Sequence, residues 1–188
     1  MSNIPNGVTT DTLNNIEFEA GLVLKTKYTS GAFNKANVLC STTGGIRVNV
    51  TPIRQVVKFD GVLDNTKGVE RVVGYTASVQ FSTKEANADM VKRAIGYSAN
   101  NATTATNVDF KQGIIPDVNY QGIYILGKLG NGTWRQICLS NAINVNGLQE
   151  TRTDKGETLI AFDLQARYTI DDQDTPPITI EYITVAGA

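Results

Sequence analysis

The chain is predicted to be mainly β, an antiparallel β-sandwich or barrel with one flanking α-helix at about residues 83–96. Three observations predict this class. Apolar residues alternate with polar ones from Val69 to Phe81 and again over 157–170, which is typical of strands with one buried and one solvated face. One segment with apolar residues at helical spacing follows the first of these strands. Asp, Asn and Gly residues separate the apolar runs and predict turns.

The N-terminal part is predicted to contain one strand between two polar segments. Residues 1–15 are polar and are expected to form a flexible arm, and residues 16–188 are expected to form one β domain. At 188 residues the chain is long enough for one domain with a core. Ile16–Leu24 alternates as a first strand. Residues 29–45 are small, polar and Gly-rich, and they predict a loop.

A long hairpin is predicted in the first half of the chain. Ile46–Phe59 reads as a strand in which Pro52 marks a sheet edge or a bulge. The segment Asp60–Gly68 is rich in Asp, Asn and Gly and joins this strand to Val69–Phe81 as an antiparallel hairpin. A strand of about a dozen residues is longer than most and suits a sheet shared between copies.

The helix is predicted from its ends and its apolar stripe. Ser82 and Glu85 have the spacing of a capping box, which would make Ser82 the N-cap. Gly96 ends the run. Residues 98–109 predict a surface loop. The residues at helical spacing are Ala86, Met90, Val91, Ala94 and Ile95.

The second half of the chain is predicted to be strands again. Asn131-Gly132 predicts a two-residue hairpin loop between Ile123–Leu129 and Thr133–Leu139. A shorter strand near Ile143 and the turn Asp154-Lys155-Gly156 precede the long strand 157–170. An acidic turn over 171–177 then leads into a last strand at 178–185.

Composition argues against several functions. The net charge of −1 does not favour binding to nucleic acid, which needs surplus Lys and Arg. The sequence contains no His, so the commonest general base and zinc ligand are missing. No signal peptide or membrane span is predicted, so we expect a cytoplasmic protein in which Cys40 and Cys138 are free thiols. No enzyme activity and no cofactor are predicted.

Four clusters were weighed as sites. The Gly-rich run 127–132 lacks the strand–loop–helix context of a phosphate loop and predicts a hairpin turn. The carboxylates of Asp171, Asp172 and Asp174 could hold a cation but are expected to form a solvated turn. Glu17 and Glu19 share a strand face without predicting catalysis. Trp134 with Tyr120 and Tyr124 could form a ligand platform, against which we favour a core or interface role for Trp134.

The layout resembles the bacteriophage major tail tube family. The segments that carry the resemblance are Val57–Gly61, Lys67-Gly68, Val73–Val79, the helix Glu85–Gly96, and Lys155–Glu157 with Asp163–Tyr168. Their order agrees with that family over about residues 16–185.

The resemblance implies six copies in a ring and rings stacked into a tube. It implies that two long hairpins per subunit join an inter-subunit β-barrel lining the bore, through which DNA passes to the host cell without specific binding. The implied partners are the chain itself, the tape measure, the tail tip or baseplate, the terminator and, in contractile tails, a sheath. The implied location is the virion tail, assembled in the host bacterial cytoplasm.

Two residue sets are expected to serve assembly. Ring-to-ring contacts are expected from the arm 1–15, the loop 29–45 and the turn 60–68. The stacking candidates in the turn are Asp60, Gly61, Asp64, Asn65, Lys67 and Gly68. The candidates for a polar face toward the lumen or a neighbour are Glu70, Thr76, Ser78, Gln80, Asp163, Gln165, Arg167 and Thr169.

Two alternative functions stay open. The first is another ring-forming component, such as a tail terminator or an Hcp-like secreted tube protein. The second is a carbohydrate-binding β-sandwich with a groove at Trp134.

Overall fold

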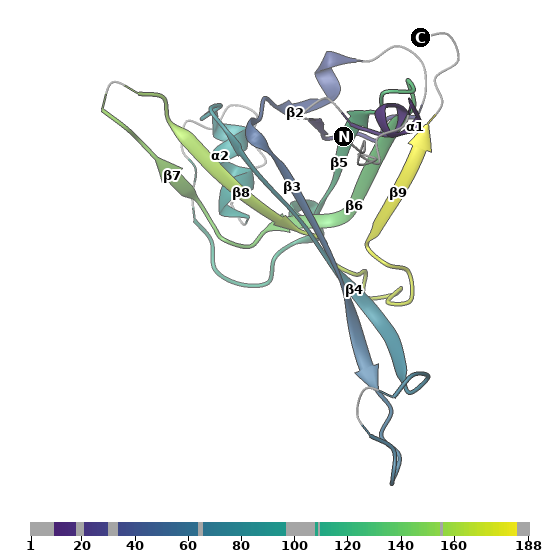
Figure 1. Ribbon diagram of the computed structural model, residues 1–188. Coiled ribbons are helices and arrows are strands. Elements are labelled where there is room, and N and C mark those ends of the chain that lie inside the picture. The colour runs from purple at the N-terminus through teal and green to yellow at the C-terminus, as the bar shows by residue number, and fades with distance from the viewer. Residues whose placement is uncertain are drawn as a thin grey trace.

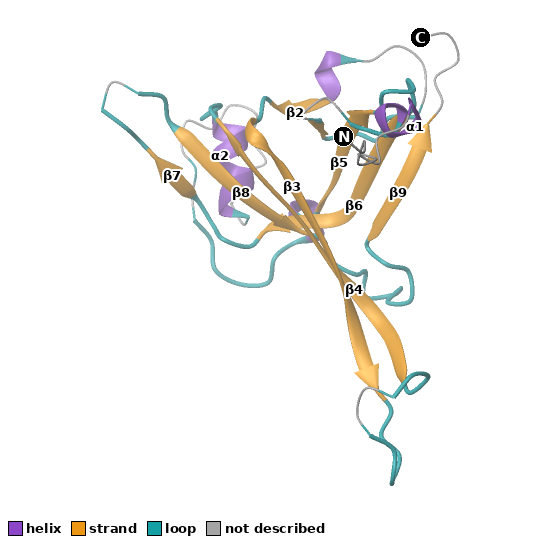
Figure 2. Cartoon of the chain, viewed as in Figure 1, coloured by secondary structure: helices purple, strands orange, loops and turns teal. Residues whose placement is uncertain are grey.

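The structure, a computed structural model, describes residues 10–17, 21–29, 34–63, 66–96, 108, 110–154 and 156–183. These ranges form a mainly β protein in which all strand pairs are antiparallel and one helix, α2, flanks the sheet, as predicted (Figures 1 and 2). The helices are α1 (Thr10–Asn14) and α2 (Ala88–Ile95), and single 3-10 turns lie at Lys35–Asn37 and Asp117–Asn119. The strands are β1 (Leu22–Leu24), β2 (Val38–Cys40), β3 (Thr43–Val56), β4 (Glu70–Thr83), β5 (Gln121–Lys128), β6 (Trp134–Asn144), β7 (Gln149–Thr151), β8 (Leu159–Gln165) and β9 (Ile178–Ile183).

One continuous sheet folds over the core and stays open. Its order is β2-β1-β5-β6-β8-β4-β3, with β9 on β6 and β7 on β8. β6 joins two halves, because its first part pairs with β5 and β9 and its last residues pair with β8. Asn141 lies between these parts with a φ of 49°, which Asn tolerates better than most residues. β3 therefore forms one end of the sheet path and β2 the other.

Both halves of the sheet and α2 contribute to a single core. Phe81 of β4 stacks on Phe162 of β8 with ring centroids 5.1 Å apart. From the other half, the core receives Val23 and Leu139, and from α2 it receives Met90. The remaining buried members of this cluster are Cys40, Ala77, Val79, Ala94, Ile123, Ile125, Ile137, Ala142, Ile160, Leu164 and Ala166.

The helix begins five residues later than predicted. Ser82 and Thr83 belong to β4 and pair with β8, so the predicted capping box at 82–85 is wrong. The N-cap is Asn87, whose side chain accepts a hydrogen bond from the Met90 N–H. Gly96 ends the helix in the left-handed conformation, as predicted. The pairing with β8 continues through Thr83 and buries that residue, and the Glu85 N–H donates to Thr83 Oγ1 at 3.1 Å.

The second long strand is shorter than predicted. β8 ends at Gln165, although a strand was expected over 157–170. It forms a hairpin with the three-residue β7. The last strand, β9, pairs with β6 and not with β8. The resemblance implies two long hairpins per subunit, whereas only the β3–β4 hairpin is long.

The two polar segments predicted near the N-terminus contain regular structure or backbone hydrogen bonds. Within the N-terminal segment 1–15, the backbone carbonyl of Asn14 accepts a hydrogen bond from Asn131 N–H at 3.0 Å. The predicted loop 29–45 contains β2 and the start of β3. The connection between β5 and β6 runs over 129–133 and not over two residues as predicted, and a hydrogen bond from Leu129 N–H to the Thr133 carbonyl closes it. Residues 1–9 and most of the predicted loop 98–109 lie outside the described residues.

Candidate assembly interface

The β3–β4 hairpin extends well beyond the body of the protein (Figure 1). β3 and β4 pair from Thr43↔Ser82 to Val56↔Glu70, whereas β8 covers β4 only from Ser78 to Thr83. The distal half of the hairpin is therefore a two-stranded ribbon. We call residues 53–73 the arm.

The arm exposes large apolar side chains that its own domain does not cover. Leu63 is 83% exposed and Phe59 is 60% exposed. Such a cluster on a monomer marks an interaction surface. A two-stranded ribbon also has little stability of its own, because it has no third strand or packed face. The other exposed apolar residues of the arm are Ile53, Val57, Val62, Val72 and Val73.

A β-bulge at Val73 changes which face each side chain occupies. The register passes from Ile53↔Gly74 to Arg54↔Val72, so Val73 is an extra residue in β4. Residues before the bulge therefore shift to the opposite face from those after it. Glu70 accordingly lies on the face of its ion-pair partner Arg54, opposite to Thr76. The prediction that Glu70 shares the polar face is wrong, and the consecutive Val72-Val73 is the sequence signal for this bulge.

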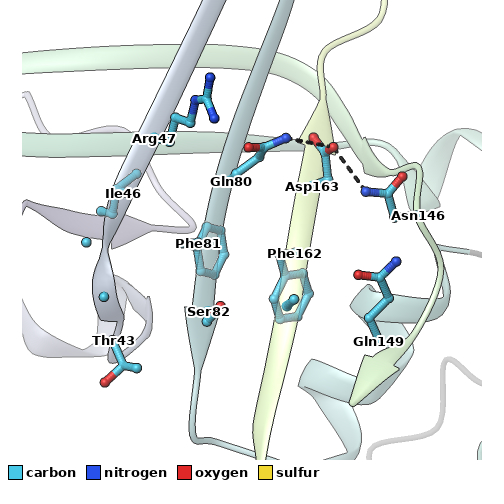
Figure 3. Close-up of a pocket in the computed structure, with 13 residues that line it drawn as sticks. Thr43, Ile46, Arg47, Gln80, Phe81, Ser82, Asn146, Gln149, Phe162 and Asp163 are labelled. Carbon is cyan, nitrogen blue, oxygen red and sulfur yellow. Dashed lines mark hydrogen bonds between the residues drawn. The ribbon is translucent and has the colours of Figure 1, made fainter. Parts of the chain in front are cut away.

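Five of the predicted face residues do lie together. Arg47, Gln80 and Asp163 form one row across β3, β4 and β8, and Asn49, Ser78 and Gln165 form the next. Gln80 Nε2 donates to Asp163 Oδ2 at 3.0 Å, and Asn146 Nδ2 donates to the same oxygen at 3.1 Å (Figure 3). A third row, Thr51 and Thr76, continues toward the arm. The result is a polar face three strands wide that carries both signs of charge.

The other two predicted face residues follow the end of β8. Arg167 Nη1 donates to Gln165 Oε1 at 2.6 Å, and Thr169 Oγ1 accepts from Asn141 Nδ2 at 3.1 Å. They contact the polar face and the bend of β6 without belonging to a strand. Their positions could not follow from alternation, because the strand stops before them.

The stacking candidates form the tip of the arm. Asp60, Gly61, Lys67 and Gly68 are exposed there, and both glycines have positive φ, 79° and 97°. The last backbone hydrogen bond before the tip runs from Val57 N–H to the Val69 carbonyl at 2.8 Å. Asp64 and Asn65 lie outside the described residues. Sequence reasoning missed the apolar neighbours Phe59, Val62 and Leu63, whose signal is an apolar run inside a turn-rich segment.

A groove of about 480 Å³ lies at the opposite end of the same two strands. It is bordered by the start of β3, where Gly44 and Gly45 both have positive φ and open space around them. Arg47, Gln80 and Asp163 lie along it (Figure 3). The other lining residues are Thr43, Ile46, Phe81, Ser82, Asn146, Gln149, Ala161 and Phe162.

The alternative sites are engaged in contacts within the chain. Glu17 forms an ion pair with Arg135, and Glu19 lies outside the described residues. The Asp172 carboxylate accepts hydrogen bonds from Thr175 and Asp174, which lowers its pKa, so it closes its own turn. Within the described part of the chain, no group of three carboxylate or Cys side chains is placed to hold a metal ion.

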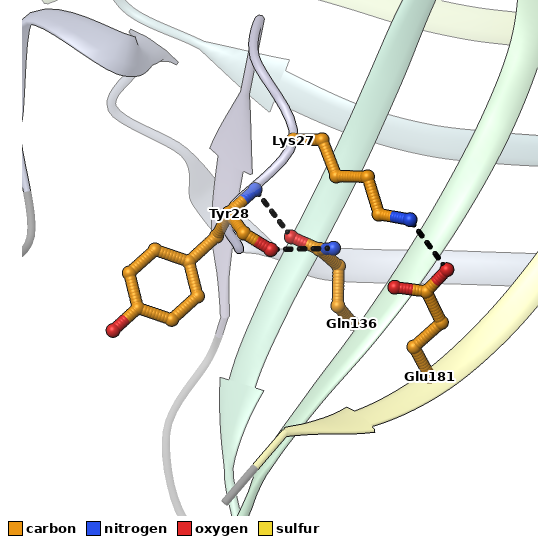
Figure 4. A network of polar contacts seen from close by, with 4 residues as sticks. All are labelled: Lys27, Tyr28, Gln136 and Glu181. Atoms are coloured by element: carbon orange, nitrogen blue, oxygen red, sulfur yellow. Dashed lines mark hydrogen bonds and ion pairs between the residues drawn. The ribbon is translucent and has the colours of Figure 1, made fainter. Parts of the chain in front are cut away.

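Trp134, for which a core or interface role is favoured over a ligand platform, has neighbours from its own chain. Trp134 contacts Tyr28, with ring centroids 6.5 Å apart, and Lys128, whose Nζ lies 5.6 Å from the ring. Gln136, fully buried, exchanges two hydrogen bonds with the Tyr28 backbone, and Lys27 pairs with Glu181 beside it (Figure 4). This network pins the segment after β1 to β6, close in the chain to Trp134.

Both cysteines are free and buried, as expected for structural thiols. Burial raises the pKa of Cys40 to about 11 and also raises that of Cys138. Among the described residues, no helix is both long and apolar enough to cross a membrane.

No protein-family model matches this chain. No curated protein matches it either. The function is therefore argued from the geometry of the arm, the polar face and the groove.

Proposed function

We propose that this protein is the structural subunit of a phage tail tube, which assembles into stacked, hexameric rings that conduct DNA to the host cell. The observation that carries the proposal is the arm, whose exposed large apolar residues have exposed fractions between 41% (Val57) and 83% (Leu63) in the part of the chain that the structure describes. Burying apolar surface contributes about 25 cal/mol per Å², so an arm of this kind is stabilised by packing against other copies.

The open sheet supports assembly for a second reason. β3 is fourteen residues long and, among the described strands, pairs with β4 alone. A long free edge is a hazard in a monomer, and closure of a ring of copies removes it. The subunit fold thus favours a polymer in which each copy completes its neighbour.

The polar face suits the wall of a conduit. The two rows that lie outside the groove present amide and hydroxyl groups, among them Asn49, Thr76 and Gln165. The whole chain has a net charge of −1, so it offers no surplus of cations to hold phosphates. DNA would slide past such a wall without specific binding. In this proposal the protein resides in the virion tail, is assembled in the host bacterial cytoplasm, and meets the tape measure, tip and terminator at the tube ends.

A tail terminator or Hcp-like secreted tube protein would use the same surfaces and differs in how many rings stack. The carbohydrate-binding alternative finds less support, because Trp134 is already in contact with Tyr28 and Lys128.

Electron microscopy of the purified protein tests the proposal. Wild-type protein is expected to form rings or tubes at high concentration, and a monodisperse 20.3 kDa species would refute it. Phe59→Ser and Leu63→Ser are expected to reduce assembly while leaving the circular dichroism spectrum unchanged, because both side chains are exposed in the monomer. Ile114→Ser, at a 94% exposed site outside the arm, is the matched control.

A further inference from the structure

The tip of the arm and the groove lie at opposite ends of the same two strands. The tip follows β3 at Val56 and precedes β4 at Glu70, whereas the groove is lined by Thr43 and Ser82 at the other end of the pair. Figure 1 shows the tip as the most distant point of the hairpin from the body. One hairpin therefore carries a projecting end and a hollowed end.

The groove offers one unpaired cation and one carboxylate. Within the described part of the chain, Arg47 has no hydrogen-bond or ion-pair partner. Asp163 accepts hydrogen bonds from the neutral amides of Gln80 and Asn146, so its charge is not compensated by a cation there. The groove offers little apolar surface, because Ile46 packs against the core and Phe81 and Phe162 are buried.

The tip offers the complementary groups. Asp60 and Lys67 are exposed and carry the opposite charges to Arg47 and Asp163. Val62 and Leu63 expose apolar surface between them. Opposite charges across an interface fix register and speed encounter.

We propose that the tip of one copy docks in the groove of a second copy, with Asp60 on Arg47 and Lys67 on Asp163. This inference rests on the proposed tube function and names the acceptor for the arm. Donor and acceptor are different surfaces, so the contact is head-to-tail. One end of the assembly keeps a free tip and the other a free groove, so the assembly can extend without closing on itself.

A charge exchange tests the contact. Arg47→Glu and Asp60→Arg are each expected to raise the protein concentration needed for tube formation by on the order of tenfold, since like charges then face each other. The double variant is expected to return to within about threefold of wild type, because the pair is restored with reversed signs. Lys111→Glu is the control, an exposed residue outside both surfaces with the same charge change.

A disulfide trap provides a second readout. Val62→Cys protein mixed with Thr43→Cys protein is expected to give a cross-linked dimer under a mild oxidant, and neither variant alone is expected to do so. The native thiols do not compete, since Cys40 and Cys138 are buried. The contact is refuted, and the tube function is not, if wild-type protein forms tubes but the double charge variant does not recover and the mixed cysteine variants do not cross-link. Wild-type protein that forms no ring or tube would overturn the tube function and the contact together.

Discussion

The phenol oxygen of Tyr168 accepts a 2.7 Å hydrogen bond from the backbone N–H of Tyr75, at the point where β4 separates from β8. Beyond this point the arm has no third strand. A Cβ at Gly74 would lie 3.0 Å from the same oxygen, so the phenol packs directly on the β4 backbone. A cleft of about 400 Å³, lined among others by Arg71, Tyr168 and Asp174, opens here. The Tyr168 side chain thus replaces the missing strand and anchors the base of the arm.

Tyr168→Phe should loosen the base of the arm without unfolding the body. The variant loses one hydrogen bond, which contributes about 1 kcal/mol. Amide hydrogen exchange at Tyr75 is therefore expected to accelerate about fivefold, while exchange at the buried Val79 amide stays unchanged. Tyr182→Phe, at an exposed site on β9, is the control. Equal exchange at Tyr75 in wild type and variant would contradict the anchoring role.

Asn144→Ala should be among the most destabilising substitutions in the chain. The buried Asn144 amide donates to the carbonyls of Ala94 and Gly147, and its oxygen accepts from Asp163 N–H at 2.8 Å. Its removal leaves several backbone groups without partners, so the free energy of unfolding should fall by about 2–4 kcal/mol in urea titration. Asn146→Ala, which removes one exposed hydrogen bond, should cost under about 1 kcal/mol. Equal losses in the two variants would refute this account.

Gly127→Ala should be coupled to Glu17. A Cβ at position 127 would overlap Glu17 Oε1, so the carboxylate must move away from Arg135. We expect a loss of about 1 kcal/mol in unfolding free energy, because the obstacle is the end of a flexible side chain. In Glu17→Ala protein the same substitution should cost clearly less. A double-mutant cycle measures the coupling, and strictly additive effects would show that the two residues do not interact.

The thiols should be protected and should make stability pH-dependent in the alkaline range. Burial raises the pKa of Cys40 from 9.0 to about 11. Because the folded pKa lies above the unfolded one, the contribution of this thiol is complete below pH 9 and declines as the pH rises toward 11. A colorimetric thiol reagent at pH 8 should label native protein slowly and unfolded protein at both cysteines. Rapid labelling of native Cys40 would contradict its burial.

The proposed head-to-tail contact limits the axial repeat of the tube. The chain between Ile46 in the groove and Gly61 at the tip spans roughly 50 Å at about 3.3 Å per residue. Strand tilt in a barrel shortens its projection on the axis. The repeat measured by electron microscopy is therefore expected to be no longer than about 50 Å. A longer repeat would exclude the docking of tip into groove between adjacent rings.

Local patterns predicted the parts of the fold that depend on neighbours in the chain. The β3–β4 hairpin follows from alternation around a turn rich in Asp and Gly, and Gly96 ends α2 because it adopts a left-handed conformation at little cost. Pro52 correctly indicated an edge strand, since β3 lies at the end of the sheet. The polar rows on β4 and β8 also followed from alternation.

Features that depend on distant partners were not predicted. Ser82 remains in β4 because β8 continues beside it, and no local signal at 82–85 contains that information. β8 ends at Gln165 although the alternation continues to Ile170, because Tyr168 turns its side chain to the β4 backbone. Glu70 changes face because a single bulge shifts the register.

The amino-acid sequence by itself determined the β class, the long hairpin, the helix and the alternating polar and apolar faces, because each depends on backbone preferences and on spacing within one segment. Only the tertiary structure decided that half of the hairpin projects with its apolar side chains exposed and that Trp134 is occupied within the chain. Those outcomes depend on where partner strands end and which distant residues meet, and a linear pattern does not encode either.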